Sequence, residues 1–261
     1  MADSNATQRE PAFPGLIWLV LSVIGICAAT AGFALGVWLV ATLVLGSDAS
    51  SNAFGLLASY DTKNLHAAPA PAQQLFFFLG IIVFLCLILA TWMAAMLRGR
   101  GQWRRVLALQ SLQRTPATSW LIIFFIAAPL YLVAASFLIR FVDPTFRTWF
   151  FVPGDPLGLV LSFLLVVVLA PIAEELLFRG FVYSWLEKMF RKSTAVIATA
   201  VFFALAHTDG GIIYPLAILL PGIALTFARA WTGSTWASMA VHACYNAWAW
   251  VLVLVLGRDL V

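Results

Sequence analysis

The stretch that decides the fold is residues 170–180, which read Ala-Pro-Ile-Ala-Glu-Glu-Leu-Leu-Phe-Arg-Gly. It places two adjacent carboxylates, Glu174 and Glu175, and the guanidinium of Arg179 inside sequence that is otherwise apolar enough for lipid. Residues 157–170, directly before the carboxylates, carry no charge. An ionisable side chain at membrane depth is costly, so such residues face a protein-lined or water-filled cavity. We therefore expect the chemistry of this chain to take place around residues 170–180.

Composition places this stretch in an integral membrane protein. The 261-residue chain is 63% hydrophobic and only 10% charged, whereas soluble domains carry about 25% charged residues. The apolar runs are long and continuous, which favours helices over the alternating pattern of a β-barrel. The net charge of +4 comes from basic residues in loops, which suits membrane topology and argues against nucleic acid as a partner. We expect an all-α, polytopic transmembrane helix bundle of seven to eight spans.

Three parts are expected along the chain. Residues 1–15 are polar and contain two prolines, which is typical of a disordered leader. Residues 16–150 hold three spans without a charged side chain or histidine in their interiors, so they are interpreted as a scaffold. Residues 158–256 hold the remaining spans and all the intramembrane charges, so they are interpreted as the catalytic core. The expected spans are about 16–45, 74–97, 119–139, 158–189, 194–207, 212–229 and 235–256.

The fourth span contains a proline, Pro171, which is predicted to kink or locally open the helix. A complete break there would raise the number of spans from seven to eight. Two basic loops, 98–114 and 188–192, are both expected to be cytoplasmic by the positive-inside rule. With seven spans the N-terminus is then cytoplasmic and the C-terminus lies outside, and we expect a multi-pass protein of the plasma membrane.

Helix geometry makes the two glutamates inequivalent. Glu175 and Arg179 are four residues apart, the spacing and order that favour an ion pair on one helix face. Glu174 is turned by about 100° from Glu175 and has no counter-charge in its own helix. A desolvated carboxylate without a partner suits the role of a general base.

Three further polar groups stand in apolar surroundings. His207 ends one apolar segment, while His242 and Asn246 share a face of the last one at four-residue spacing. An imidazole and a carboxamide can each donate a hydrogen bond to a developing oxyanion. An alternative for Asn246 is a purely structural bond to a neighbouring helix. The three cysteines show no paired spacing, which argues against a disulfide framework and a thiolate metal site: Cys27, Cys86 and Cys244.

The pattern Glu174-Glu175-x-x-x-Arg179, then Phe203-x-x-x-His207, then His242-x-x-x-Asn246 resembles the three motifs of the CAAX-protease and bacteriocin-processing family. This family, also called Abi, comprises intramembrane glutamate endopeptidases, and the resemblance covers roughly residues 158–250. It implies a bundle with a cavity that admits a peptide and water.

By the resemblance, Glu174 would activate water with help from His207, and His242 with Asn246 would form the oxyanion hole. Glu175 and Arg179 would support the site. It also implies metal-independent hydrolysis, without a cofactor, of a peptide bond in a membrane-associated protein or peptide. The best-known substrates of the family are prenylated proteins, but no residue in this sequence points to a prenylated substrate.

Other functions remain as alternatives. Glu174, His207 and His242 form a ligand set that suits zinc. A non-catalytic scaffold or regulator would bind a partner protein through the same cavity. A transporter would use the buried glutamate and histidines as a proton relay, but the chain shows no internal repeat of the transporter kind. The sequence lacks the His-Glu-x-x-His and Gly-x-Ser-x-Gly motifs of zinc and serine hydrolases.

Overall fold

The computed structural model describes residues 12–45, 65–114, 118–144, 151–208 and 213–257, and in these ranges it is helical and without a β-strand. The expected all-α fold is therefore confirmed. Residues 1–11 of the predicted leader lie outside the described residues, and the first helix already begins at Ala12. The division into scaffold and core stays a prediction.

Each of the seven expected spans corresponds to one helical segment, with bounds that differ by a few residues. The segments are α1 (Ala12–Leu45), α3 (Ala70–Arg98), α5 (Thr118–Val142), the composite helix Pro156–Met189, α9 (Lys192–Leu205), α10 (Tyr214–Thr232) and α11 (Thr235–Leu256). Six of them are long and apolar enough to cross a membrane, and α9 is a shorter apolar helix. Two short elements complete the described part, the 3₁₀ turn Leu65–Ala67 and α4 (Trp103–Val106).

The composite helix is continuous through Pro171, but it is not regular. It runs as α6 (Pro156–Phe163), a π-helical segment Leu164–Leu169, α7 (Ala170–Glu175), a second π-helical segment Leu176–Val182, and α8 (Tyr183–Met189). The predicted opening at Pro171 thus takes the form of wider turns on both sides, and the break that would have made two spans does not occur. Such π-helical turns are rare and lie frequently at functional sites.

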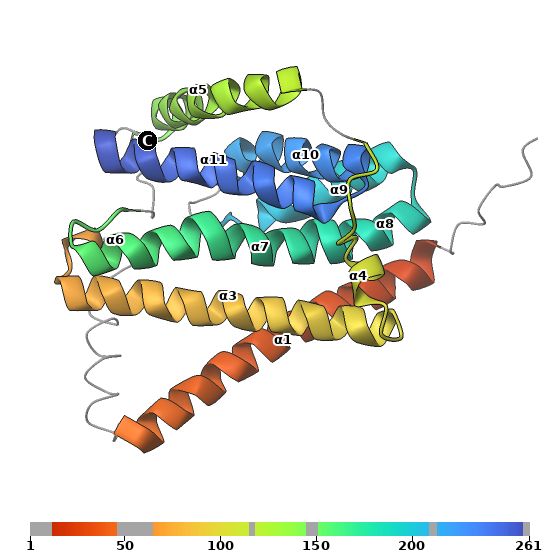
Figure 1. Ribbon diagram of the computed structural model, residues 1–261, viewed down its shortest axis with the longest axis horizontal. Coiled ribbons are helices and arrows are strands. Elements are labelled where there is room, and N and C mark those ends of the chain that lie inside the picture. The colour runs from red at the N-terminus through yellow and green to blue at the C-terminus, as the bar shows by residue number, and fades with distance from the viewer. Residues whose placement is uncertain (1–11, 46–64, 115–117, 145–150, 209–212, 258–261) are drawn as a thin grey trace, which may run out of the picture.

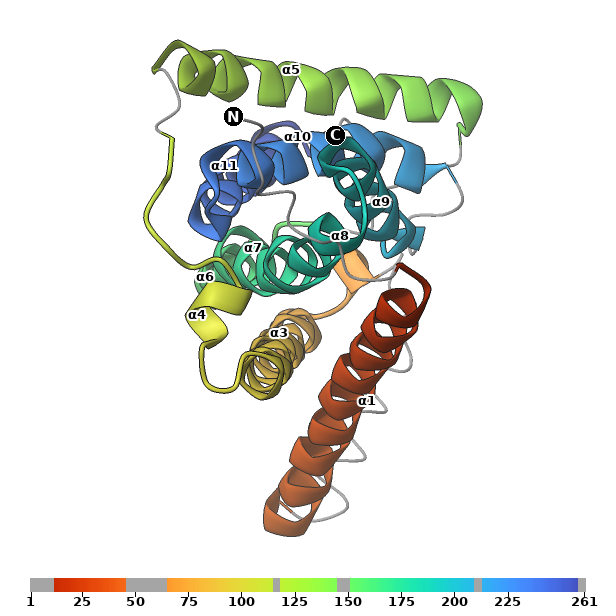
Figure 2. The ribbon, with the colours of Figure 1, turned by 90° about the vertical axis from the view of Figure 1, so that its right-hand side faces the viewer.

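The composite helix lies in the middle of the bundle. In Figure 1 it runs between α3 on one side and α10 with α11 on the other, while α5 covers the outer side of α10 and α11. Figure 2 shows α1 diverging from the bundle, oblique to α3, as expected for an apolar run longer than a bilayer requires. The segment with Glu174 and Glu175 is therefore surrounded by other helices.

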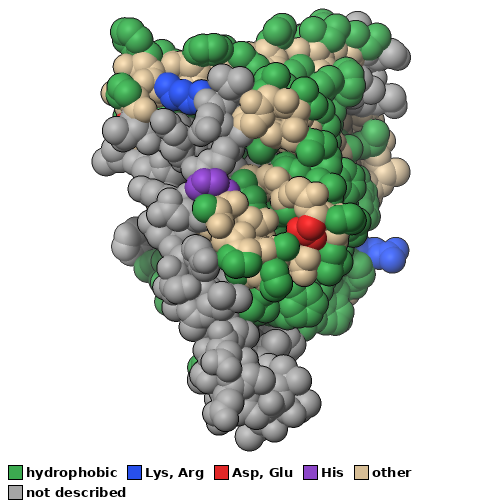
Figure 3. All heavy atoms as spheres, turned by 90° about the vertical axis from the view of Figure 1, so that its left-hand side faces the viewer, with side chains coloured by type: hydrophobic (Ala, Val, Ile, Leu, Met, Phe, Trp, Pro, Cys, Tyr) green, Lys and Arg blue, Asp and Glu red, His purple; other side chains and the backbone are tan. Residues whose placement is uncertain are grey.

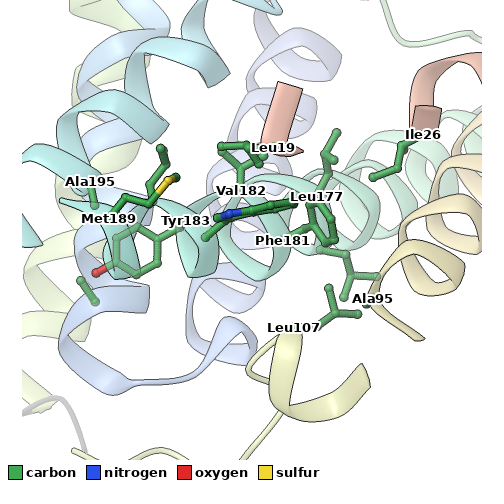
Figure 4. Packing of buried hydrophobic residues seen from close by; sticks show 14 of the residues in the cluster. Leu19, Ile26, Ala95, Leu107, Leu177, Phe181, Val182, Tyr183, Met189 and Ala195 are labelled. Carbon is green, nitrogen blue, oxygen red and sulfur yellow. The ribbon is translucent and has the colours of Figure 1, made fainter. Parts of the chain in front are cut away.

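The largest hydrophobic cluster fixes one end of the bundle. Figure 4 shows its side chains meeting from α1, α3, the loop after α4, the second half of the composite helix and α9. Phe181, Tyr183 and Leu186 are almost fully buried there. Between helices in a bilayer the close van der Waals contact of such side chains is what favours association, so this cluster anchors the helix that carries the carboxylates.

The two basic loops lie at the same end of the bundle. The loop 107–113 bonds the turn between α10 and α11, through Gln113 N to Thr232 O at 2.8 Å and Thr235 N to Ala108 O at 3.0 Å. That turn contains Gly233, which closes α10 in the left-handed conformation with φ of 72°. α8 and α9 join at this end too, so residues 98–114 and 188–192 lie together, as the predicted topology requires.

Candidate active site

The predicted ion pair between Glu175 and Arg179 is present and completely buried. Nη1 of Arg179 donates to Oε1 of Glu175 at 2.7 Å, and both side chains are 0% exposed. The pair belongs to the composite helix, and the i, i+4 spacing brings the two groups together within one helix face.

Helix α10 supplies the remaining acceptors of the guanidinium. Nη2 of Arg179 donates to the carbonyl of Gly222 at 3.0 Å, and Nε donates to Oγ1 of Thr226 at 3.2 Å. The missing side chain of Gly222 permits α10 to pack closely on α9, because a Cβ there would meet Ala200 O and the Phe203 ring at 3.3 Å. The Phe203 ring also stacks on the guanidinium, with Cζ 4.2 Å from the ring centroid. Arg179 thereby fixes the composite helix against α9 and α10.

Glu174 faces away from this pair and toward the two predicted histidines. Its Oε2 lies 3.9 Å from Nε2 of His207 and 3.9 Å from Nε2 of His242. The three side chains are 16%, 23% and 7% exposed, in the order Glu174, His207 and His242. A separation of 3.9 Å is too long for a direct hydrogen bond, and it leaves room for a shared water molecule or a substrate atom.

The far nitrogen of each histidine is held by a hydrogen-bond acceptor. Nδ1 of His207 donates to the carbonyl of Phe203 at 2.7 Å, and Nδ1 of His242 donates to Oε1 of Glu175 at 2.8 Å. Since a carbonyl and a carboxylate only accept, both Nδ1 atoms carry a proton. Both Nε2 atoms are therefore the ones turned toward Glu174, and the Glu175 carboxylate orients His242 as well as neutralising Arg179.

Asn246 has a bond to the backbone of the composite helix. Its Nδ2 donates to the carbonyl of Val166 at 2.8 Å. The Val166 carbonyl has no backbone donor within the helix. In the π-helical turn the N–H of Ala170 bonds the carbonyl of Leu165. The same spacing would pair Val166 with residue 171, but Pro171 has no N–H. Asn246 therefore makes the hydrogen bond to a neighbouring helix that was the structural alternative for this residue. The second N–H of its carboxamide can donate to another acceptor.

These groups line one cavity of about 200 Å³. Glu174, His207, His242 and Asn246 all contribute to its wall, together with Tyr245. Apolar side chains from α3, α5, α10 and α11 make up most of the remainder, as expected of a site that binds a largely apolar ligand. This cavity therefore contains four of the six predicted site residues, and the other two lie in the buried pair beside it.

Several residues at the site were not foreseen from the sequence. Ser136 and other residues of α5, a helix interpreted as scaffold, form part of the cavity wall. Tyr131 of the same helix donates to the carbonyl of Ala217 in α10 at 2.5 Å. The sequence indicates them only weakly, because Tyr131 and Ser136 are isolated hydroxyl side chains in an otherwise apolar helix. Thr226 and Gly222, which bind Arg179, carry no motif.

The zinc alternative stays a hypothesis. Among the residues that the structure describes, no three or more side chains of His, Cys, Asp or Glu are arranged so that they could hold a metal ion. The free thiols Cys27, Cys86 and Cys244 lie apart from one another on α1, α3 and α11.

The chain was compared with known protein families. Residues 156–248 match the family described as type II CAAX prenyl endopeptidase Rce1-like. A search of curated proteins and a search of solved structures found no match. The matched range begins with α6 and ends within α11, so it contains all six predicted site residues. The match to the Rce1-like family over residues 156–248 agrees with the resemblance of the three motifs to the CAAX-protease and bacteriocin-processing family.

Proposed function

We propose that the protein is an intramembrane endopeptidase in which Glu174 activates water, without a metal ion or cofactor. The observation that carries the proposal is the convergence of two histidine Nε2 atoms on one carboxylate oxygen, each at 3.9 Å, inside a cavity enclosed by membrane-spanning helices. The Rce1-like match supports the broader class, a membrane-bound peptidase.

Glu174 and His207 are the pair that would hold the attacking water. In its neutral form His207 presents a lone pair at Nε2, because its proton is on Nδ1 and bonded to Phe203. Carboxylate and lone pair are both acceptors, so a water between them donates one hydrogen to each. Glu174 then takes a proton as the water oxygen bonds to the carbonyl carbon, and it returns that proton to the amine when the C–N bond breaks.

Asn246 and His242 are the donors that would meet the oxyanion. The carboxamide of Asn246 has one N–H on Val166 and a second one available. His242 donates from Nδ1 to Glu175, so it can also donate from Nε2 only when both ring nitrogens carry protons. Each donor aimed at a developing oxyanion is worth ~3 kcal/mol of barrier.

Glu175 and Arg179 would act as positioning residues. Oε1 of Glu175 receives bonds from both Arg179 and His242, so the buried pair sets the ring orientation of His242. This is the arrangement in which a carboxylate fixes the tautomer and the angle of a catalytic imidazole.

The substrate would be a peptide segment of a membrane-associated protein. The cavity occupies the half of the bundle away from the basic loops: its wall includes the late residues Ile139 of α5 and Val253 of α11, and the early residue Leu165 of the composite helix. Figure 3 looks at that end of the molecule, where charged side chains are few among the described residues. If the basic loops are cytoplasmic in a plasma membrane, as proposed from the positive-inside rule, the cavity opens toward the opposite side.

The experiment is a comparison of the termini of membrane proteins in cells that carry the wild type, Glu174→Gln or Glu187→Gln. Glu187 is a carboxylate on α8 outside the cavity, so Glu187→Gln is the matched control. We expect new termini with the wild type and the control that vanish with Glu174→Gln. Unchanged termini, with one protein that co-purifies with every variant, would replace the proposal by a scaffold or regulator.

A further inference from the structure

A second and larger cavity lies at the opposite end of the bundle. It has a volume of about 830 Å³ and forms where α3, α8 and α10 end. It shares no lining residue with the cavity that contains Glu174. Figure 2 shows this end of the molecule facing the viewer, with α4 and α8 in front. The endopeptidase mechanism gives this cavity no role.

The wall of this cavity is strongly positive. It contains one carboxylate, Glu187, and five cationic side chains: Arg98, Arg105, Lys188, Lys192 and Arg229. They come from four different parts of the chain, the end of α3, the loop with α4, the α8–α9 junction and the last turn of α10. Such a concentration of one charge raises the local concentration of anions.

Arg229 is the buried member of this set and is incompletely bonded. Its side chain is 7% exposed, and its Nε has no hydrogen-bond partner among the described residues. Nη2 donates to Oγ of Ser184 at 3.3 Å, and the nearest carboxylate oxygen, on Glu187, is 3.6 Å away. A buried guanidinium with an unused donor, lining a cavity, calls for an anionic acceptor.

The position of the cavity relative to the membrane surface indicates which kind of anion it binds. Trp231 and Trp236, on either side of the turn between α10 and α11, are 49% and 55% exposed, and tryptophan gathers at the membrane–water interface. Leu97, next to Arg98, is 81% exposed, so the rim continues into an apolar helix surface. A molecule with a negative head group and apolar chains would match both the cavity wall and this helix surface.

We propose that this cavity binds the phosphate of an anionic phospholipid from the leaflet at the basic end of the bundle. Basic pockets between transmembrane helices on the cytoplasmic side bind lipid head groups in this way. The bound phosphate would bridge α3, α8 and α10. The proposal is independent of whether Glu174 hydrolyses peptides.

The test is native mass spectrometry of the full chain in detergent, titrated with phosphatidylglycerol or phosphatidylcholine. Arg105→Gln and Arg104→Gln form a matched pair, because both arginines are exposed neighbours and only Arg105 lines the cavity. We expect phosphatidylglycerol to bind preferentially, with affinity about fivefold lower in Arg105→Gln and about 25-fold lower when Lys188 and Lys192 are both changed to Gln. Arg104→Gln should bind as the wild type does.

Two results would overturn the proposal. Equal losses in Arg104→Gln and Arg105→Gln would mean that lipid responds only to the net charge of this end. Displacement of the lipid by inorganic phosphate at equal concentration, with the same dependence on Arg105, would assign the cavity to a soluble anion instead. Arg229→Lys keeps the buried charge but loses the fork of donors, so weaker phosphatidylglycerol binding in this variant would further support the lipid site.

Discussion

The buried pair of Glu175 and Arg179 gives the sharpest prediction about stability. Changing Arg179 to Met removes a guanidinium that bonds three acceptors and leaves the carboxylate of Glu175 buried, with His242 as its remaining bonded donor. Breaking one half of a buried ion pair costs ~3–5 kcal/mol. Since whole domains are stable by only ~5–15 kcal/mol, Arg179→Met should lose about a third or more of the unfolding free energy.

Glu175→Gln should cost a similar amount, because it leaves the guanidinium buried without its counter-charge. The double variant should be more stable than either single variant by ~2 kcal/mol or more, since it buries no charge and Gln at 175 still offers His242 an acceptor. Glu174→Gln should change stability by less than ~1 kcal/mol, because within the described part of the chain Glu174 makes no hydrogen bond and its two histidine neighbours are 3.9 Å away. Two adjacent glutamates are thus predicted to differ several-fold in their effect on stability.

The assay is equilibrium unfolding of the purified chain in mixed micelles at fixed pH, followed by circular dichroism, with the wild type, both single variants and the double variant. Arg104→Met is the control, an exposed arginine whose loss should change the unfolding free energy by less than ~0.5 kcal/mol. Additive costs, with the double variant as the least stable protein, would refute the coupling. So would single variants that cost less than ~1 kcal/mol, because the pair would then not be desolvated.

Three further predictions concern the site and its surroundings. Pro171→Ala supplies an N–H that competes for the Val166 carbonyl. Cleavage should therefore fall by about 100-fold, the effect of one lost oxyanion donor, while the melting temperature stays at or above that of the wild type. Unchanged cleavage would show that Asn246 needs no backbone anchor. The hydrogen bonds from Gly158 N and Gln74 hold the pKa of the Asp155 carboxyl below its usual value. The stabilisation of the start of α6 by Asp155 is therefore complete above about pH 4 and is lost as the pH falls below that. Asp155→Asn should remove this pH dependence from thermal melts, and an unchanged profile would contradict the role. In a variant without native cysteines, Ala249→Cys in the cavity wall should react with an impermeant maleimide added outside intact cells. Gln110→Cys, at the basic end, should react only after lysis. Labelling of Gln110→Cys in intact cells, with Ala249→Cys labelled only after lysis, would mean the opposite orientation.

The helices could be predicted from the sequence because each depends on local information. An apolar run long enough for a bilayer forms a helix in lipid, whatever its neighbours, since its backbone groups have no other partner. The ion pair between Glu175 and Arg179 was equally accessible, because the four-residue spacing fixes it within one helix. For the same reason the helix geometry alone separated Glu175 from Glu174.

The contacts between helices could not be predicted in the same way. The bond from His242 to Glu175 joins residues 67 positions apart, and nothing near either residue signals the other. α5 is apolar apart from a few residues such as Tyr131 and Ser136, and these are too few to distinguish the face toward lipid from the face that lines the cavity. The motifs indicated which side chains meet, but the hydrogen bonds that orient each one depend on how the helices pack.

The irregular turns of the composite helix connect the local structure of one helix with a contact between two helices. In a regular α-helix the carbonyl of Val166 would accept from the N–H of Ala170, and Asn246 would have to share this acceptor with that donor. In the wide turn Leu164–Leu169 the N–H of Ala170 donates to the carbonyl of Leu165 instead. Pro171, the next residue, has no N–H to donate to Val166. The carbonyl so released is the one that holds Asn246 beside Glu174. A proline two residues after a wide turn therefore permits the local opening. It also leaves free the backbone carbonyl that positions Asn246 from another helix.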